Sequence, residues 1–392
     1  MKICQINIYY NQGSTGKIVA SIHQYLKTQG HQSYVFHGLG LNSEDETVIK
    51  IANDKLCFWY GRLCRLIGKR FLCAPIETLR LIHKLDELKP DIVHIHCMNC
   101  YYINPVMLFH YLGRINCKVL ITNHADMNFT ANCDCAFDCM KWKTGCGNCP
   151  YDKGNFHSMF FDRTHSSWQS FYNGFMEIKN LYVSSVSVFT NKRAVESPFF
   201  KHAREFKVIE NGIDTSIFKY HNSKQNNNNA VLHVTPNYSD PNKGFLYVIK
   251  MARQFPNISF IIVGVDVLPN MPSNMIFMSK ITDASNLACI YSSVNVTLLT
   301  SRSESFSLVC AESLCCGTPV VGFRSGGPET IAISDFSTFV EYGNEEALRS
   351  SLEAFLNRKW DKRIISNLAQ QKYKRESMAE KYLGLYKEIV TI

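Results

Sequence analysis

Two carboxylates, Glu304 and Glu312, stand eight residues apart in a segment whose residue types could bind a charged, hydroxylated ligand. Carboxylate oxygens accept hydrogen bonds from sugar and ribose hydroxyls. A spacing of eight would place both side chains on roughly one face of a helix. One acid could then hold a sugar while the other holds the ribose of a nucleotide. The alternative from spacing alone is that Glu304 caps a helix and Glu312 is solvated.

The residues around these acids predict a strand, a loop, a helix and a second strand. Residues 294–300 form an apolar, β-branched run typical of a buried strand, and residues 301–305 form a polar loop. Residues 306–315 have helical apolar spacing, and a Gly-Thr-Pro sequence ends that helix before the next strand, residues 320–323. In a parallel sheet this loop lies at the carboxyl edge, where ligands bind, and the helix offers unpaired N–H groups to an anion.

The sequence SRSESFSLVCAESLCCGTPVV, followed by GGPE, resembles the donor-site signature of the family 4 retaining glycosyltransferases. The likeness includes the family's two glutamates with seven residues between them, its Gly-Thr-Pro-Val-Val turn and its Gly-Gly loop. It implies the α/β fold called GT-B, in which two Rossmann-like, doubly wound parallel-sheet domains face each other across a cleft. The branch resembled is the bacterial surface-polysaccharide type with a Cys-rich insertion.

This resemblance implies roles for individual residues of the segment. Glu304 would hold the hydroxyls of the donor sugar, and Glu312 would hold the ribose. The N–H groups near Phe306, Ser307 and Leu308 would stabilise the negative charge that develops on the leaving diphosphate.

A basic residue is expected to assist that charge stabilisation. Lys243 and the glycine after it match the family's Lys-Gly, which neutralises the donor diphosphate. The family also has an Arg in this region, but uncharged residues, among them Asn242, stand in its place here. We expect either that Arg302 or Arg324 replaces this Arg, or that helix N–H groups bind more of the donor's charge.

A glycine-bearing loop follows the first predicted strand, residues 3–9. It is not a P-loop, because Asn11 and Ile18 stand where that motif needs Gly and Ser or Thr. Gly13 and Gly16 would let the backbone approach a ligand closely. The resemblance implies that this loop faces the donor phosphates; a plain strand-to-helix turn is the alternative.

A histidine follows a later predicted strand, residues 119–122. His124 and Asp126 stand in a Thr-Asn-His-Ala-Asp context, and the resemblance implies that His124 contacts the donor sugar. His94 and His96, at the end of another apolar strand, are weaker candidates by the same reasoning. A lone histidine in any of these places is more often structural.

A cysteine-rich insertion spans about residues 129–153. Its closing Cys-x2-Cys beside a glycine is typical of a zinc knuckle, whereas its first half departs from paired spacing. The spacing predicts a structural zinc site; free or reversibly oxidised thiols are the alternative. The predicted ligands are Cys133, Cys139, Cys146 and Cys149, with Cys135 as a substitute for Cys133.

Residues 57–72 combine aromatic and aliphatic side chains with several cations. Such a segment could lie on an anionic bilayer, with its cations reaching the phosphates. A buried helix with charged ends is the alternative.

The composition is that of a globular protein. Of 392 residues, 19% are charged and 46% are hydrophobic, and no run of about 18 apolar residues predicts a transmembrane helix. The net charge of +9 lies mostly in the first half, which favours an anionic surface or substrate, whereas no basic run supports nucleic acid as a partner. Sixteen cysteines without a recognisable secretion signal indicate a reducing compartment. We therefore expect a cytoplasmic protein, peripheral on the inner face of the plasma membrane if the acceptor is lipid-linked.

The predicted domain organisation has four parts. They are an acceptor-binding domain (residues 1–200), a hinge and linker (201–229), a nucleotide-sugar-binding domain (230–376) and a final helix (377–392) that crosses back to the first domain.

The function that these expectations favour is transfer of a sugar, with retention, from a UDP- or GDP-sugar to a glycan acceptor in capsule, exopolysaccharide or O-antigen synthesis. No Asp-x-Asp motif is present, so we expect catalysis without a metal cofactor. The alternatives are a nucleotide-sugar epimerase of the same fold and a non-catalytic, zinc-stabilised binding protein.

Overall fold

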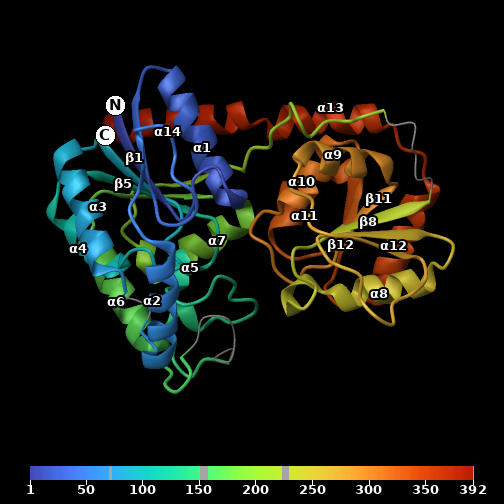
Figure 1. Ribbon diagram of the computed structural model, residues 1–392, viewed down its shortest axis with the longest axis horizontal. Coiled ribbons are helices and arrows are strands. Elements are labelled where there is room, and N and C mark those ends of the chain that lie inside the picture. Colours follow the sequence, from blue (N-terminus) through green and yellow to red (C-terminus); the bar gives the residue numbers. More distant parts are fainter. Residues whose placement is uncertain (70–72, 151–157, 223–228, 392) are drawn as a thin grey trace. The chain divides into compact units, whose positions relative to one another are not determined.

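The computed structural model describes residues 1–69, 73–150, 158–222 and 229–391. The chain divides by internal packing into two units (Figure 1). Unit 1 comprises Met1–Glu210 and Met378–Ile392, and unit 2 comprises Asn211–Ser377. Of the predicted hinge and linker, residues 201–229, the stretch 223–228 lies outside the described residues.

Unit 1 contains a seven-stranded sheet with the order β3-β2-β1-β4-β5-β6-β7, in which every pairing is parallel. Its strands are β1 (Lys2–Asn7), β2 (Gln32–His37), β3 (Val48–Lys50), β4 (Ile92–Ile95), β5 (Lys118–Asn123), β6 (Leu181–Ser185) and β7 (Phe206–Val208). Its α-helices are α1 (Gly13–Thr28), α2 (Asp54–Ile67), α3 (Pro75–Leu88), α4 (Pro105–Arg114), α5 (Met127–Thr130), α6 (Thr164–Glu177), α7 (Val188–Glu196) and α14 (Arg375–Thr391), which begins at the end of unit 2.

Both faces of this sheet are buried, because successive side chains of a strand point to opposite faces. On β1, Ile3 packs with α1 and α14, whereas Cys4 belongs to the core formed with α3, α4 and α6. Two apolar faces per strand explain why the strands have continuous apolar runs rather than alternation. Figure 1 shows α1 and α14 together on one side of β1 and β5.

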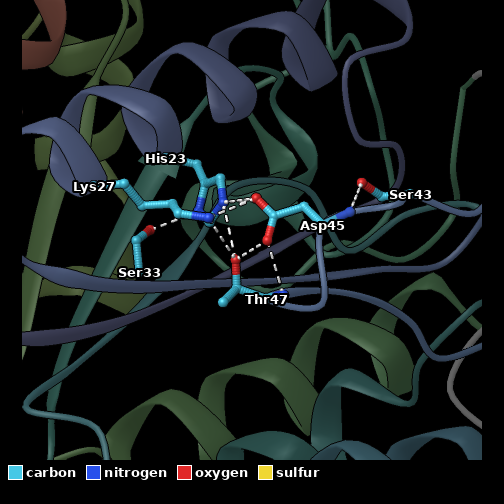
Figure 2. Close-up of polar contacts among 6 residues, drawn as sticks. All are labelled: His23, Lys27, Ser33, Ser43, Asp45 and Thr47. Carbon is cyan, nitrogen blue, oxygen red and sulfur yellow. Dashed lines mark hydrogen bonds and ion pairs between the residues drawn. The ribbon is translucent and has the colours of Figure 1, made fainter.

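A polar cluster fastens the loop between β2 and β3 to α1 (Figure 2). The buried His23 of α1 bonds through Nδ1 to Ser33 Oγ (2.8 Å) and lies 3.3 Å from Asp45 Oδ2 through Nε2. Lys27 Nζ lies 2.8 Å from the same Asp45 oxygen. Burial lowers the pKa of His23, and the cluster therefore holds the loop with a neutral imidazole.

Unit 2 contains a six-stranded parallel sheet with the order β10-β9-β8-β11-β12-β13. Its strands are β8 (Ala230–Val234), β9 (Ser259–Val263), β10 (Met275–Met278), β11 (Val296–Leu299), β12 (Val320–Phe323) and β13 (Ser337–Val340). Its α-helices are α8 (Phe245–Gln254), α9 (Ala284–Ser293), α10 (Leu308–Cys315), α11 (Gly327–Ile331), α12 (Glu345–Asn357) and α13 (Lys362–Tyr373). The two parallel sheets confirm the predicted α/β class.

Side-chain hydrogen bonds set the ends of two elements of unit 1. The strand β6 ends at Ser185, because Ser187 soon afterwards caps α7 through a reciprocal capping box with Thr190. The helix α6 begins at Thr164, whose N–H donates to Asp162 Oδ1.

Candidate functional site

The helix α10 begins at the carboxyl edge of the unit 2 sheet, directly after β11 and its loop. Ser307 is its N-cap and accepts a hydrogen bond from the Cys310 N–H (3.3 Å). Ser307 has a φ of 76°, a conformation that costs a non-glycine residue about 1–3 kcal/mol. This left-handed residue starts the helix abruptly, so the N–H groups of the first turn are available near Phe306, Ser307 and Leu308.

Lys243 and Glu304 form an ion pair beside this loop, with Nζ 2.7 Å from Oε1. Both side chains are about a quarter exposed, so the pair is reachable by a ligand. The two residues are 61 positions apart in the sequence. The structure thus brings together two of the predicted catalytic residues from separate loops of one sheet edge.

The loop that carries Lys243 packs directly onto the end of β11. Thr300 Oγ1 donates to the Lys243 carbonyl (2.8 Å). Gly244 has a φ of +60°, and a Cβ there would lie 2.1 Å from the Thr300 carbonyl oxygen. Only glycine fits this contact, and the Lys-Gly pair is therefore required for the position of the lysine.

The Gly-Gly-Pro-Glu segment braces the backbone of Glu304. The Glu304 N–H donates to the Ser325 carbonyl, and the Gly327 N–H donates to the Glu304 carbonyl, both at 2.8 Å. A Cβ on Gly327 would lie 2.5 Å from the Ser305 carbonyl carbon. Glu329 accepts from the N–H groups of Ser325 and Gly326 and so fixes the turn. The motif holds the carboxylate in place without contributing a charge to the ion pair.

Asn242 occupies the region where the family has an Arg. Its side chain links the loop that carries Lys243 to the loop that carries Glu304. Its side chain donates to the Ser303 carbonyl and accepts from the Ser303 N–H, each at 2.9 Å. Arg302 is exposed, and Arg324 Nη1 is paired with Glu341 at 2.7 Å. The expected replacement of the family's Arg by Arg302 or Arg324 stays a prediction.

Glu312 lies on α10, partly buried, and its Oε2 accepts from Tyr291 Oη of α9 at 3.2 Å. The same-face argument for the two glutamates is wrong, because α10 begins only at Leu308 and Glu304 lies in the loop before it. Burial, and then the charge of Glu312, raise the pKa of Tyr291 well above its usual value, so the phenol is a hydrogen-bond donor. Sequence reasoning missed Tyr291, whose pattern is that of a core residue.

We expect Tyr291→Phe to weaken donor binding while leaving turnover nearly unchanged. The phenol orients one oxygen of Glu312, and loss of such a bond is worth about 1–3 kcal/mol when the acceptor is charged. The KM for the donor should therefore rise about tenfold with kcat within about twofold. Tyr220→Phe, which removes a phenol that donates a hydrogen bond to Asn222 Oδ1, is the matched control. An unchanged donor KM would show that Glu312 needs no orientation by Tyr291.

In unit 1, His124 follows β5 at the carboxyl edge of the sheet, half-buried. Its Nε2 lies 3.0 Å from Nδ1 of the buried His96, whose Nε2 in turn lies 3.1 Å from Gln5 Oε1. With Gln5 Oε1 as the acceptor, His96 donates through its Nε2–H. The Nδ1 of the neutral His96 is then unprotonated and accepts a hydrogen bond from His124. His124 then carries its proton on Nε2 and presents Nδ1 as an acceptor.

His94 has a structural environment. Its Nδ1 lies 2.7 Å from Tyr386 Oη and its Nε2 lies 2.6 Å from Thr122 Oγ1, all fully buried. Of the three candidate histidines, His124 is the one that is not fully buried. Burial lowers the pKa of His124 to about 3, and the pKa values of His94 and His96 lie well below the usual range. These imidazoles are neutral near pH 7.

This cluster makes the stability of unit 1 depend on pH. The unfolded histidines titrate near pH 6.5, whereas the folded ones do not, so the unfolded state binds more protons as the pH falls below 6.5. Stability is therefore full above pH 6.5 and should fall below it by up to about 1.4 kcal/mol per pH unit for each histidine. Urea unfolding from pH 7.5 to 5 should show a shallower slope in His124→Asn. His83→Asn, at an exposed position, should keep the wild-type slope, and equal slopes in all three proteins would contradict the assignment.

Asp126, two residues after His124, is paired with a cation inside unit 1. Its Oδ2 lies 2.8 Å from Nη1 of Arg193 on α7 and accepts from the Ala136 N–H at 2.7 Å. Both side chains are buried, and burial raises the pKa of Asp126 to about 6 against the opposing effect of Arg193. Asp126 thus anchors the start of the insertion to α7.

The glycine loop after β1 holds a short, close turn. Gly13 is the first residue of α1 and has a φ of +65°. A Cβ on Gly16 would lie 3.1 Å from the Tyr9 carbonyl oxygen, and the Asn11 N–H donates to the Gly16 carbonyl. Close packing against Tyr9 is enough to explain a glycine at position 16. The predicted approach of its backbone to a ligand stays a prediction.

Among the described residues, no group of three or more His, Cys, Asp or Glu is arranged so that it could hold a metal ion. Burial raises the pKa of the Cys146 thiol to about 12. Zinc binding by Cys133, Cys135, Cys139, Cys146 and Cys149 therefore stays a prediction from their spacing.

Comparisons with known proteins agree with this fold. Residues 216–375 match the family model described as glycosyl transferases group 1. The putative colanic acid biosynthesis glycosyl transferase WcaC of Escherichia coli K12 is 20% identical over 99% of this chain and 100% of its own length. Sucrose-phosphate synthase from Thermosynechococcus elongatus superposes with a TM-score of 0.68 at 16% identity, covering 100% of this chain and 99% of that one. Anabaena HepE, solved with UDP and glucose, superposes with a TM-score of 0.64 at 14% identity, covering 99% of each chain.

Two parallel α/β units that superpose along nearly their whole length on glycosyltransferases define the GT-B fold, as predicted. The family model spans the unit that carries Lys243, Glu304 and Glu312. Residues 216–375 therefore resemble the group 1 glycosyl transferases, and the chain as a whole is similar to a putative glycosyl transferase of colanic acid biosynthesis.

Within the described residues, none of the helices is long and apolar enough to cross a bilayer.

Proposed function

We propose that this protein is a glycosyltransferase that moves a sugar from a nucleotide-diphosphate sugar to a growing bacterial surface glycan, with retention at the anomeric carbon and without a catalytic metal. The Lys243–Glu304 pair beside the amino end of α10 is the observation that carries the proposal. The similarity to a colanic acid transferase and to a fold solved with UDP and glucose supports the glycan class and the donor class.

The leaving group sets the main chemical demand. The bond from the anomeric carbon to the diphosphate oxygen breaks, and its electron pair stays on that oxygen. Lys243 and the first N–H groups of α10 would stabilise the negative charge that accumulates there. A carbon–oxygen bond to the acceptor hydroxyl forms on the same face, and the hydroxyl proton passes to the leaving diphosphate oxygen.

The two acids would position the donor. When Lys243 turns to the diphosphate, Glu304 is left to accept hydrogen bonds from sugar hydroxyls, and Glu312, oriented by Tyr291, would accept from the ribose. The role proposed for His124 at the donor sugar rests on the family resemblance. Its lowered pKa fits a neutral hydrogen-bonding partner and not a general acid.

The acceptor and the location follow from the same proposal. A growing surface glycan is carried on a lipid, so we expect a lipid-linked acceptor and an enzyme that works at the inner face of the plasma membrane. The basic first half of the chain agrees with an anionic surface.

Thermal stabilisation by UDP-, GDP- and ADP-sugars, followed by transfer of label from the best donor to lipid-linked glycans, tests the proposal. We expect one nucleotide class to stabilise the protein and the label to appear in the glycan. Label that remains in free nucleotide sugar with a changed epimer would indicate an epimerase. Absence of stabilisation by every nucleotide sugar would argue against the donor site.

A further inference from the structure

The helix α2 of unit 1 differs from an ordinary amphipathic helix. Its small residues face the core, and its large apolar residues face solvent. Cys57, Gly61 and Cys64, spaced four and three residues apart, are its buried positions. A Cβ on Gly61 would lie 3.1 Å from the ring of Tyr101, so glycine allows the helix to lie close to its neighbour. Burial of the helix is thus achieved without its large side chains.

A second stripe of α2 consists of exposed apolar side chains. Leu56, Trp59, Leu63 and Leu66 follow one another at intervals of three, four and three residues and are 46%, 61%, 48% and 46% exposed. Because these side chains are about half exposed, each one forgoes roughly half of the ~1.5–3 kcal/mol that full burial would contribute. An uninterrupted stripe of this kind marks a surface that another apolar phase covers.

A third stripe, beside the second, is basic. Lys55, Phe58, Arg62, Arg65 and Lys69 follow at intervals of three, four, three and four residues, and no acid stands between Lys55 and Lys69. The Arg62 guanidinium lies 4.7 Å from the Phe58 ring centroid and 5.5 Å from that of Trp59. Cations therefore lie directly alongside the apolar stripe.

A segment nearly 100 positions later extends the apolar surface. The Met159 N–H donates to the Arg65 carbonyl at 2.8 Å, which places the segment at the carboxyl end of α2. Met159, Phe160 and Phe161 are 64%, 69% and 55% exposed. The guanidinium of Arg163 lies 5.4 Å from the Phe161 ring. Two separate segments thus contribute exposed large apolar side chains and cations to one region.

The acids nearest to this region already have partners. Asp54 lies 2.8 Å from Lys50 Nζ, and Asp162 accepts hydrogen bonds from Thr164 and from the Cys149 N–H. The uncompensated charge of the surface is therefore positive.

We propose that this surface, formed by the exposed residues of α2 and residues 159–161, docks on an anionic lipid bilayer. Its apolar side chains would enter the headgroup boundary while the adjacent cations meet lipid phosphates. The position of α2 on the outside of the unit 1 sheet leaves it accessible within that unit (Figure 1). The basic stripe disfavours a second copy of the chain as the occupant, since a two-fold interface would place like charges opposite one another.

The docking surface is independent of the donor site in unit 2, so binding is measured with the full chain and no sugar nucleotide. The assay is co-sedimentation with phosphatidylcholine vesicles that contain or lack phosphatidylglycerol. We expect binding to the anionic vesicles to exceed binding to the neutral ones and to fall with added salt. Arg62→Gln with Arg65→Gln should lower the partition coefficient about 30-fold, since each cation near the surface contributes about fivefold.

Matched variants separate docking from general surface effects. Trp59→Ala with Leu63→Ala should lower binding about tenfold or more, whereas Leu246→Ala with Val267→Ala, at exposed apolar positions of unit 2, should not. Arg253→Gln with Lys280→Gln is the corresponding charge control, because both side chains are exposed in unit 2. Transfer to a soluble acceptor should stay at the wild-type level in all four variants, which keeps this test apart from that of the proposed function.

Tryptophan emission gives a direct readout of insertion. Trp142 and Trp168 are buried and Trp360 is partly buried, so a blue shift on vesicle addition reports mainly Trp59. Trp59→Phe should keep binding but lose most of the shift. Equal sedimentation of wild type and the α2 variants, or equal binding to neutral and anionic vesicles, would overturn the proposal. So would a dimer in solution that Trp59→Ala with Leu63→Ala dissociates, if no vesicle binding is seen.

Discussion

Lys243→Ala is expected to lower turnover about 10²–10³-fold while the protein stays folded. The lysine is the cation of the Lys243–Glu304 pair, and a preorganised charge aimed at a leaving group is worth several kcal/mol in the transition state. Its contribution to stability should be about 1 kcal/mol or less, because both partners are about a quarter exposed and solvent screens the pair. The measurement is kcat for label transfer, with the melting temperature recorded in parallel.

Glu304→Ala should also lower turnover severely, and the double variant should lose much less than the product of the two single effects. The two side chains lie 2.7 Å apart and act on one donor, so their contributions should not be additive. Lys243→Arg should recover part of the activity, since it keeps the charge but changes its geometry.

The ion pair Lys250–Glu345 provides the matched control. It also joins a lysine to a glutamate across unit 2 at similar exposure, but it lies outside the loops that surround α10. Lys250→Ala should leave kcat within about twofold. An equal loss in Lys250→Ala, or wild-type turnover in Lys243→Ala, would remove Lys243 from the active site.

The strand, loop and helix around Glu304 could be predicted from the sequence because their signals are local. A β-branched run, a polar loop and helical spacing identify β11 and α10, and the structure places them at residues 296–299 and 308–315. The start of α10 could not be predicted, because the left-handed backbone of Ser307 is imposed by the packed loop and not by a residue preference.

The partners of the site residues could not be predicted, because they come from distant parts of the sequence. Asn242 bonds with Ser303 across 61 positions, and Asp126 pairs with Arg193 across 67. From the sequence, Asp126 of the Thr-Asn-His-Ala-Asp segment could be an acid of the active site. Only the fold shows that its side chain is buried and paired with Arg193. Exposure could not be predicted either. The spacing of residues 57–72 suited both a buried and a membrane-facing helix, whereas the structure shows which side chains of residues 57–69 are exposed; residues 70–72 lie outside the described part of the chain.

Asp126→Ala is expected to destabilise unit 1 by about 3–5 kcal/mol. It removes the carboxylate 2.8 Å from Arg193 and leaves a guanidinium with an exposed fraction of only 8% without its counter-charge. The aromatic rings of Phe129 and Trp142, at 5.5 and 5.6 Å from that guanidinium, cannot hydrogen-bond to it as a carboxylate does. The Ala136 N–H would also lose its acceptor.

Urea unfolding followed by tryptophan emission measures this loss, because Trp59, Trp142 and Trp168 all lie in unit 1. The titration belongs at pH 7.5, above the pKa of about 6 that burial gives Asp126, where its carboxylate is ionised. Glu353→Ala, which breaks an exposed pair with Arg349, should cost less than about 0.5 kcal/mol.

Replacing both partners distinguishes a structural pair from a ligand-binding acid. Asp126→Ala with Arg193→Met should recover much of the lost stability, since an apolar pair removes the buried unpaired charge. Transfer activity of this double variant at low temperature, where it is folded, should approach that of the wild type. A folded double variant without activity, or an Asp126→Ala variant of wild-type stability, would instead place Asp126 among the groups that contact the substrate.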